Sequence, residues 1–111
     1  MSSGKKQVRA AFREAVFRRA RYKCEGPGCS FRSSLEKAVI ELDAHHITDR
    51  NEMPNGGYVP ENGIALCGPC HEKAEQFHAT GVALPGFAPE ELYKVIGSSR
   101  DAAEKASRRL G

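Results

Sequence analysis

The sequence contains no tryptophan, and phenylalanine and tyrosine make up only 7% of its 111 residues. With 40% hydrophobic residues, a chain of this length predicts one domain, residues 1–111. Its small core needs an additional stabilising element, such as a cross-link or a structural metal. No apolar run approaches the roughly 20 residues of a membrane span, which excludes a transmembrane protein. No apolar segment follows the basic N-terminus, as a secretory signal requires, so we expect a cytoplasmic protein.

The basic residues are concentrated at the N-terminus. Residues 1–23 contain eight Lys or Arg and one Glu, whereas the rest of the chain is acidic on balance. An apolar residue at every fourth position predicts a helix over residues 5–21. These positions are Val8, Phe12, Val16 and Ala20. Arg9, Arg13 and Arg18 lie largely away from this stripe, which favours contact with nucleic acid; a merely solvated helix face is the alternative.

The four cysteines form two short-spaced pairs. Cys24 and Cys29 enclose four residues, Cys67 and Cys70 enclose two, and 37 residues separate the pairs. Two such pairs can surround one ion tetrahedrally, and thiols stay reduced in the expected compartment. A structural zinc site is therefore favoured over disulfides.

The remaining pattern predicts an α+β fold. A strand is expected at 38–47, a long loop at 48–60, a second strand at 64–67 and a helix at 68–79. Two further helices are expected within 89–110. Pro89 opens the first of them, and Ser98 caps the second, with Asp101 as its capping-box partner.

Histidines gather around the predicted hairpin and helix. His45 and His46 are adjacent near the end of the first strand, and His71 follows the last cysteine. A divalent ion held by His45 and His71, with His46 as general base, would suit a metal-dependent nuclease. Consecutive strand residues point to opposite faces, so His45 and His46 can serve one site only where the strand ends or bulges. Asp43 shares the strand face of His45 and is a candidate ligand or outer partner.

Each histidine also has a structural interpretation. His45 or His46 could be a hydrogen-bonded strand residue, and His71 could replace a cysteine on zinc. His78 lies on nearly the same helix face as His71, seven residues further on, and we interpret it as a packing or surface residue.

Three stretches together resemble the HNH endonuclease family. They are DAHHI, a loop containing GG, and ENGIALCGPCH, and with the first cysteine pair they cover about residues 22–79. The knuckle around Cys24 and Cys29 is similar to the zinc-binding subset of that family. The resemblance implies a ββα-metal fold, in which a hairpin, a long loop and a helix surround one divalent ion. The helices at 5–21 and 89–110 lie outside it.

The same resemblance implies a role for individual residues. His45 takes the place of the first metal ligand, His71 that of the helix ligand, and His46 that of the general base. Asn62 takes the place of an asparagine whose side chain pins the loop and so orients the base. Colicin-type nucleases are similar in their His-His pair, but they carry a second helix histidine where this chain has Glu75. Glu75 or water is therefore expected as the third ligand.

The expected function is metal-dependent hydrolysis of phosphodiester bonds in DNA. Mg²⁺ or Mn²⁺ is the expected catalytic ion, because hard cations suit phosphate oxygens; nickel, cobalt or zinc would also accept two histidines. The alternative is a non-catalytic four-cysteine zinc module that binds nucleic acid. That alternative does not account for the joint occurrence of His45, His46, Asn62 and His71. A monomer and a homodimer both remain open.

Overall fold

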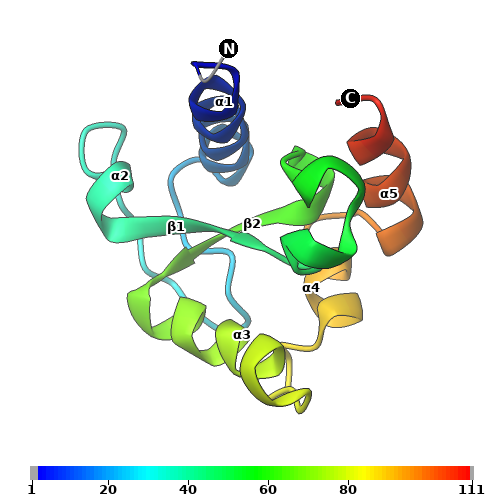
Figure 1. The fold of residues 1–111 in the computed structure, drawn as a ribbon. Coiled ribbons are helices and arrows are strands. Elements are labelled where there is room, and N and C mark those ends of the chain that lie inside the picture. The colour runs from blue at the N-terminus through cyan, green and yellow to red at the C-terminus, as the bar shows by residue number, and fades with distance from the viewer. Residues whose placement is uncertain (1–2, 111) are drawn as a thin grey trace.

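The computed structural model describes residues 3–110 and confirms the predicted α+β fold (Figure 1). A two-stranded antiparallel sheet, β1 (Leu42–His46) and β2 (Gly63–Cys67), lies at its centre. The helices are α1 (Ser3–Ala20), α2 (Ala38–Glu41), α3 (Gly68–Thr80), α4 (Pro89–Val95) and α5 (Arg100–Arg108). Both α1 and α3 contact the two strands, and they lie on opposite sides of the sheet.

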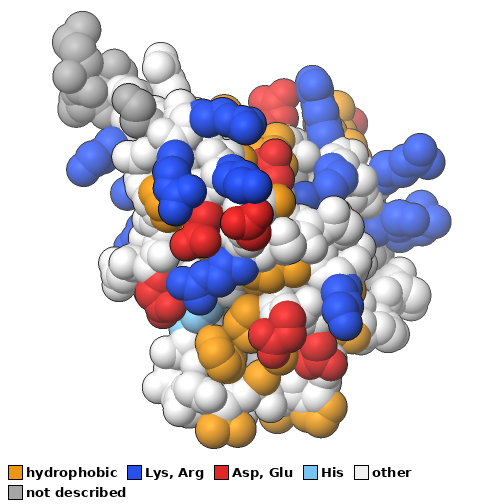
Figure 2. Space-filling view, turned by 90° about the vertical axis from the view of Figure 1, so that its right-hand side faces the viewer, with side chains coloured by type: hydrophobic (Ala, Val, Ile, Leu, Met, Phe, Trp, Pro, Cys, Tyr) orange, Lys and Arg blue, Asp and Glu red, His pale blue; other side chains and the backbone are white. Residues whose placement is uncertain are grey.

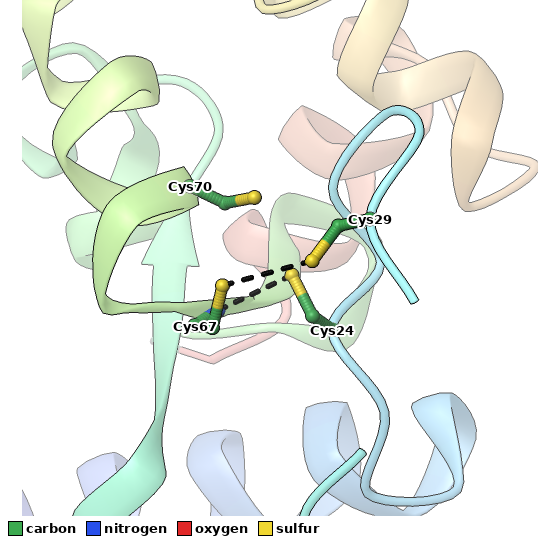
Figure 3. Close-up of side chains that lie close together, drawn as sticks. All are labelled: Cys24, Cys29, Cys67 and Cys70. Carbon is green, nitrogen blue, oxygen red and sulfur yellow. Dashed lines mark hydrogen bonds between the residues drawn. The ribbon is translucent and has the colours of Figure 1, made fainter. Parts of the chain in front are cut away.

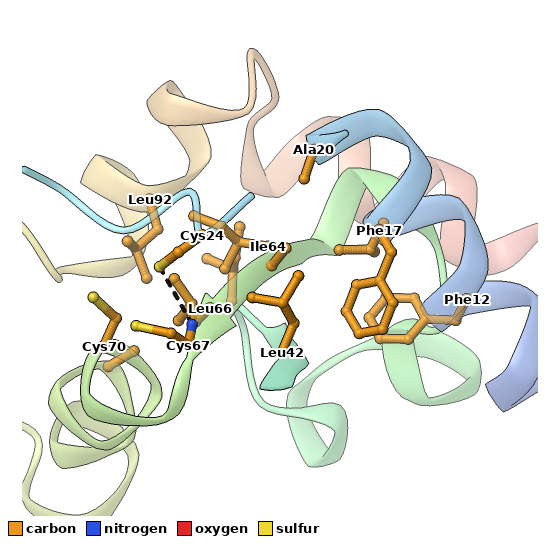
Figure 4. Packing of buried hydrophobic residues seen from close by; sticks show 14 of the residues in the cluster. Phe12, Phe17, Ala20, Cys24, Leu42, Ile64, Leu66, Cys67, Cys70 and Leu92 are labelled. Atoms are coloured by element: carbon orange, nitrogen blue, oxygen red, sulfur yellow. Dashed lines mark hydrogen bonds between the residues drawn. The ribbon is translucent and has the colours of Figure 1, made fainter. Parts of the chain in front are cut away.

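The apolar face of α1 packs against the sheet (Figure 4). Phe12, Val16 and Ala20 are at most 5% exposed, as their four-residue spacing predicted. Val8 differs from this prediction: it is 37% exposed, in a groove that it shares with Tyr58. Burying a valine or phenylalanine side chain contributes about 1.5–3 kcal/mol, so Phe12 and Val16 contribute most of the stabilisation from this stripe.

The start of β2 lies directly under α1. At Gly63, a Cβ atom would come within 2.5 Å of Val16 Cγ2, so only glycine allows this close approach. Arg19 fixes the same corner by donating to Pro60 O at 2.8 Å and to Gly63 O at 2.7 Å. Its guanidinium also contacts Glu25 Oε1 at 2.8 Å, which ties α1 to the cysteine knuckle.

The first strand is shorter than predicted. Residues 38–41 form the single turn α2, and only residues 42–46 pair with β2. The strand prediction for Val39 and Ile40 was wrong because β2 ends at Cys67, opposite Leu42, and leaves nothing to pair with them. Both side chains are solvent-exposed, at 66% and 86%. Ser34 starts the helical turn instead, because its carbonyl accepts from Ala38 N at 2.8 Å.

The chain between the strands is ordered by short turns and by the C-terminal helices. Its three 3₁₀ turns are η1 (Arg50–Glu52), η2 (Pro54–Gly57) and η3 (Pro60–Asn62). α5 packs against η2 and η3. Asn55 Nδ2 donates to Ser107 O at 2.9 Å, and Ser98 Oγ donates to Glu61 O at 2.8 Å. These bonds hold the loop that follows the two adjacent histidines.

The C-terminal helices begin close to their predicted positions. Pro89 is the first residue of α4, as expected. The N-cap of α5 is Ser99, one residue later than predicted, because Ser99 Oγ accepts from Ala102 N at 3.0 Å while Ser98 is engaged by the loop. No helix within residues 3–110 is long and apolar enough to cross a membrane.

Candidate active site

The four cysteines meet at one point, between the knuckle after α1 and the corner that joins β2 to α3 (Figure 3). Their sulfur atoms all lie within 4.8 Å of one another, and none forms a disulfide. Cys29 Sγ and Cys67 Sγ are 3.8 Å apart. Four ligands at the Zn–S distance of about 2.3 Å would be separated by about 3.8 Å in a tetrahedron. The cluster predicted from the spacing therefore exists and fits zinc.

The backbone around Cys24 is shaped for a thiolate. The N–H groups of Gly26 and Cys67 both point at Cys24 Sγ, each at 3.3 Å. A Cβ atom at Gly26 would lie 2.7 Å from Cys70 Sγ, so glycine is needed for the knuckle to close. Burial raises the pKa of the Cys24 thiol to about 11. In the absence of an ion this thiol keeps its proton at neutral pH, and a metal must displace that proton to bind.

A second cluster lies between β1 and α3. His45 points from β1 toward α3 and is 2% exposed. It meets one face of the helix, on which His71, Glu75 and His78 follow one another at helical spacing. The ring centroid of His45 lies 5.2 Å from the rings of both His71 and His78.

A single carboxylate oxygen connects the two histidines predicted as metal ligands. Glu75 Oε2 lies 3.1 Å from His45 Nδ1 and 3.3 Å from His71 Nε2. His45 Nδ1 nevertheless forms no hydrogen bond with any described residue, although it is buried. A buried imidazole nitrogen and a carboxylate oxygen at this distance are donor atoms that could bind a cation. Asp43 Oδ2 lies 3.2 Å from His71 Nδ1, the place of an outer partner that orients the ring.

Burial keeps His45 uncharged. Desolvation, assisted by the neighbouring His71, His78 and His46, lowers its pKa to about 3. A neutral imidazole is the form that can bind a metal ion.

His78, which the sequence suggested was a packing or surface residue, lies in this second cluster. One ligand atom each from His45, Glu75 and His78 falls within a mutual distance of 4.8 Å. His78 Nε2 also lies 3.0 Å from the backbone oxygen of His46, to which it can donate. The positions 71, 75 and 78 differ by four and three residues, so the helical spacing itself was the signal for a shared face.

His46 points to the other side of β1. Its ring stacks on Phe12 of α1, with centroids 4.7 Å apart, and meets Tyr58 edge-on at 4.7 Å. Its Nε2 is buried and has no hydrogen-bond partner among the described residues. Burial, reinforced by the charge of Arg50, lowers the pKa of His46 to about 4, so the ring is neutral and can accept a proton at pH 7.

Asn62 fixes the backbone just after this pair of histidines. It is fully buried, and its side chain pairs with both backbone groups of Thr48 at 3.0 Å. Tyr93 of α4 donates its hydroxyl to Asn62 Oδ1 at 2.7 Å. Ile47 N also bonds to Asn62 O, at 2.9 Å. Asn62 therefore fixes the backbone at Thr48, two residues after His46, where the chain leaves β1.

One groove joins the two sides of β1 across its free edge. It measures about 350 Å³, and His46 from one face and Asp43 and His71 from the other all line it. Three arginines line it as well: Arg9, Arg13 and Arg50. His46 and His71 therefore reach one common space, whereas His45 does not line this groove.

The basic residues are unevenly placed around this groove. Arg50 Nη1 donates to the Tyr58 hydroxyl at 3.1 Å, and the Arg9 guanidinium lies 5.9 Å from the Tyr58 ring centre. Arg18 instead pairs with Glu14 at 3.1 Å and lies in a different groove, between α1 and α2. On the face shown in Figure 2, Lys and Arg side chains gather mainly over the upper half, with acidic side chains between them.

Comparison with known proteins agrees with this geometry. Residues 24–77 match the family model described as HNH endonuclease. This central segment, just under half of the chain, is similar to the HNH endonuclease family. A search of curated proteins and a search of solved structures each returned no match.

The HNH segment does not contain every residue that shapes the site. Phe12 and Arg9, which contact the His46 side of the groove, come from α1 before it, and Tyr93 comes from α4 after it. Arg50, which was not singled out from the sequence, lies at the groove, and His78, which was interpreted as a packing or surface residue, lies at the second cluster.

Proposed function

We propose that this protein is a metal-dependent HNH endonuclease that hydrolyses phosphodiester bonds in DNA, acting as one domain. The groove at the edge of β1 carries the proposal. A nuclease must bind a phosphate beside a general base and a metal ligand, and this groove combines His46, His71 and three arginines. Guanidinium groups suit phosphate oxygens because they can donate two parallel hydrogen bonds.

In this proposal His45 and His71 hold the catalytic ion, and Glu75 is a further ligand. Asp43 Oδ2, 3.2 Å from His71 Nδ1, would orient the ring and leave its Nε2 available to a bound ion. A bound divalent ion polarises the scissile phosphate and stabilises the charge that develops on the leaving oxygen. Mg²⁺ and Mn²⁺ suit the phosphate oxygens, and the imidazole ligands also admit nickel, cobalt and zinc.

His46 is the proposed general base. It is neutral at pH 7, and its buried Nε2 has no competing partner among the described residues. A phosphate bound in the groove adds negative charge nearby, which raises the pKa of His46 toward the value that favours proton transfer from water. Phe12 holds one face of the ring, and Asn62 holds the backbone that follows it.

The four cysteines supply stability in this proposal. Their zinc fastens the knuckle to the start of α3, which carries His71 directly after Cys70. The cysteine cluster alone would also suit a non-catalytic zinc module that binds nucleic acid. Such a module has no use for a buried His45 with an unpartnered Nδ1 beside a carboxylate, so we favour the enzyme.

The test is nicking of supercoiled plasmid with Mn²⁺, compared with EDTA. His46→Ala should lower the rate by about 10²–10⁴-fold while metal affinity stays unchanged, because a general base is lost. His45→Ala should instead weaken metal binding, so that excess Mn²⁺ restores part of the rate. Wild-type protein that binds DNA but never nicks it in any divalent ion would support the zinc module.

A further inference from the structure

The helix that carries His71 presents one more nitrogen ligand to the second cluster. We propose that His78 binds the catalytic ion together with His45 and Glu75, and that the site therefore selects a transition metal such as Ni²⁺, Co²⁺ or Zn²⁺ over Mg²⁺. The inference rests on the proposed function in assuming that this cluster holds the catalytic ion. It goes beyond it in naming a ligand and a metal class.

Distances bring His78 within reach of a shared ion. Its ligand atom and those of His45 and Glu75 lie within 4.8 Å of one another. Ligands at about 2.0–2.2 Å from zinc stand roughly 3.4 Å apart in a tetrahedron, so small side-chain rotations close the site. The His45–Glu75 distance of 3.1 Å is already in that range.

The hydrogen bond of His78 fixes its tautomer and leaves one ring nitrogen able to bind a metal ion. Its Nε2 lies 3.0 Å from the backbone oxygen of His46, and a carbonyl can only accept, so the proton sits on Nε2. Nδ1 is then left with a free lone pair. Metal-binding histidines usually donate their other N–H to a carbonyl or carboxylate in this way.

The composition of the donor set decides the metal class. His45, His71 and His78 offer imidazole nitrogens around the single carboxylate of Glu75. Imidazole suits zinc, nickel and cobalt, whereas Mg²⁺ prefers oxygen ligands and retains its waters. With His78 as a third imidazole beside a single carboxylate, the donor set is dominated by nitrogen, which disfavours Mg²⁺.

The experiment measures metal binding, without DNA, to protein whose cysteine site is already filled with zinc. Isothermal titration with NiCl₂ should show one further site in the wild type, and titration with MgCl₂ should show far weaker binding. His78→Ala should weaken Ni²⁺ binding by about 10–100-fold or more, since changes even to outer partners of a metal site cost that much. Glu72→Ala, an exposed change on the same helix, is the matched control and should bind Ni²⁺ like the wild type.

His78→Gln separates a ligand from a structural residue. Glutamine keeps an N–H that can reach the backbone oxygen of His46 but lacks the imidazole lone pair. We expect it to bind Ni²⁺ as weakly as His78→Ala. Recovery of wild-type affinity in His78→Gln, unchanged affinity in His78→Ala, or equal wild-type affinity for Mg²⁺ and Ni²⁺ would overturn the inference. Protein that binds Ni²⁺ through His78 but does not nick plasmid would instead overturn only the proposed nuclease function.

Discussion

Replacing Asn62 with alanine should cost both stability and catalysis, in amounts that the structure allows to be worked out. Asn62 is fully buried, and its amide satisfies the N–H and the carbonyl of Thr48. Alanine leaves both groups without their partner. At about 1–3 kcal/mol for each unsatisfied buried group, the free energy of unfolding should fall by about 2–6 kcal/mol.

Loss of the hydrogen bond between Tyr93 and Asn62 should contribute less. The Tyr93 hydroxyl loses Asn62 Oδ1 but keeps the Thr48 hydroxyl at 2.7 Å, so it is not left unpaired. Tyr93→Phe removes this hydroxyl without touching the backbone bonds, and it should cost only about 1 kcal/mol. Asn51→Ala, in the exposed part of the same loop, should leave stability unchanged and serves as the control.

The assay combines urea denaturation of zinc-loaded protein with single-turnover plasmid nicking at saturating Mn²⁺. Asn62→Ala should nick more slowly than the wild type, because the backbone after His46 is no longer fixed, yet bind Mn²⁺ with the same affinity. The effect on rate should be smaller than that of His46→Ala, which removes the base itself. A wild-type urea midpoint and a wild-type rate in Asn62→Ala would refute this reasoning.

Three further outcomes are expected. Cys67→Ser should lose zinc and unfold, which elemental analysis and circular dichroism would detect; a folded, active protein without zinc would contradict the site. The double variant Arg9→Ala/Arg13→Ala should weaken DNA binding. It should also reduce the slope of log affinity against log salt concentration by about two, because each phosphate that is no longer neutralised removes roughly 0.9 from the slope. Arg18→Ala should change this slope little. Since the pKa of His46 is lowered to about 4, its neutral form persists well below pH 6.5 and is lost only as the pH falls through the lowered value. The acid limb of kcat/KM should therefore lie below pH 6.5, and a limb at or above 6.5 would argue against His46 as the base.

Contiguous motifs were the part of the site that the sequence predicted well. Short spacing and a tight turn bring the members of each cysteine pair together locally, and the fold then brings the two pairs to one point. His45 and His46 diverge because β1 keeps its alternation to its last residue, as consecutive strand residues must. The groove at the edge of β1 brings His46 together with Asp43 and His71 from the other face, whereas His45 does not line it.

The features that were missed depend on packing between distant segments. His78 joins the second cluster only because α3 turns that face toward β1, and its sequence spacing gives the face but not its direction. Arg50 reaches the groove through the path of the three 3₁₀ turns, which a segment rich in glycine and proline does not specify. Val39 and Ile40 are β-branched residues with a high strand propensity. They form no strand because no neighbouring strand is available to pair with them.

The position of α1 links the basic N-terminus to the chemistry of the HNH segment. Phe12 covers one face of the His46 ring and excludes water from it, and this burial is the main cause of the lowered pKa of His46. One turn away, Arg9 lines the groove on the same side. The helix that would attract DNA is thus the helix that positions the proposed base. Since both residues precede residues 24–77, the family segment alone lacks one wall of its own groove, and α1 is best regarded as part of the site.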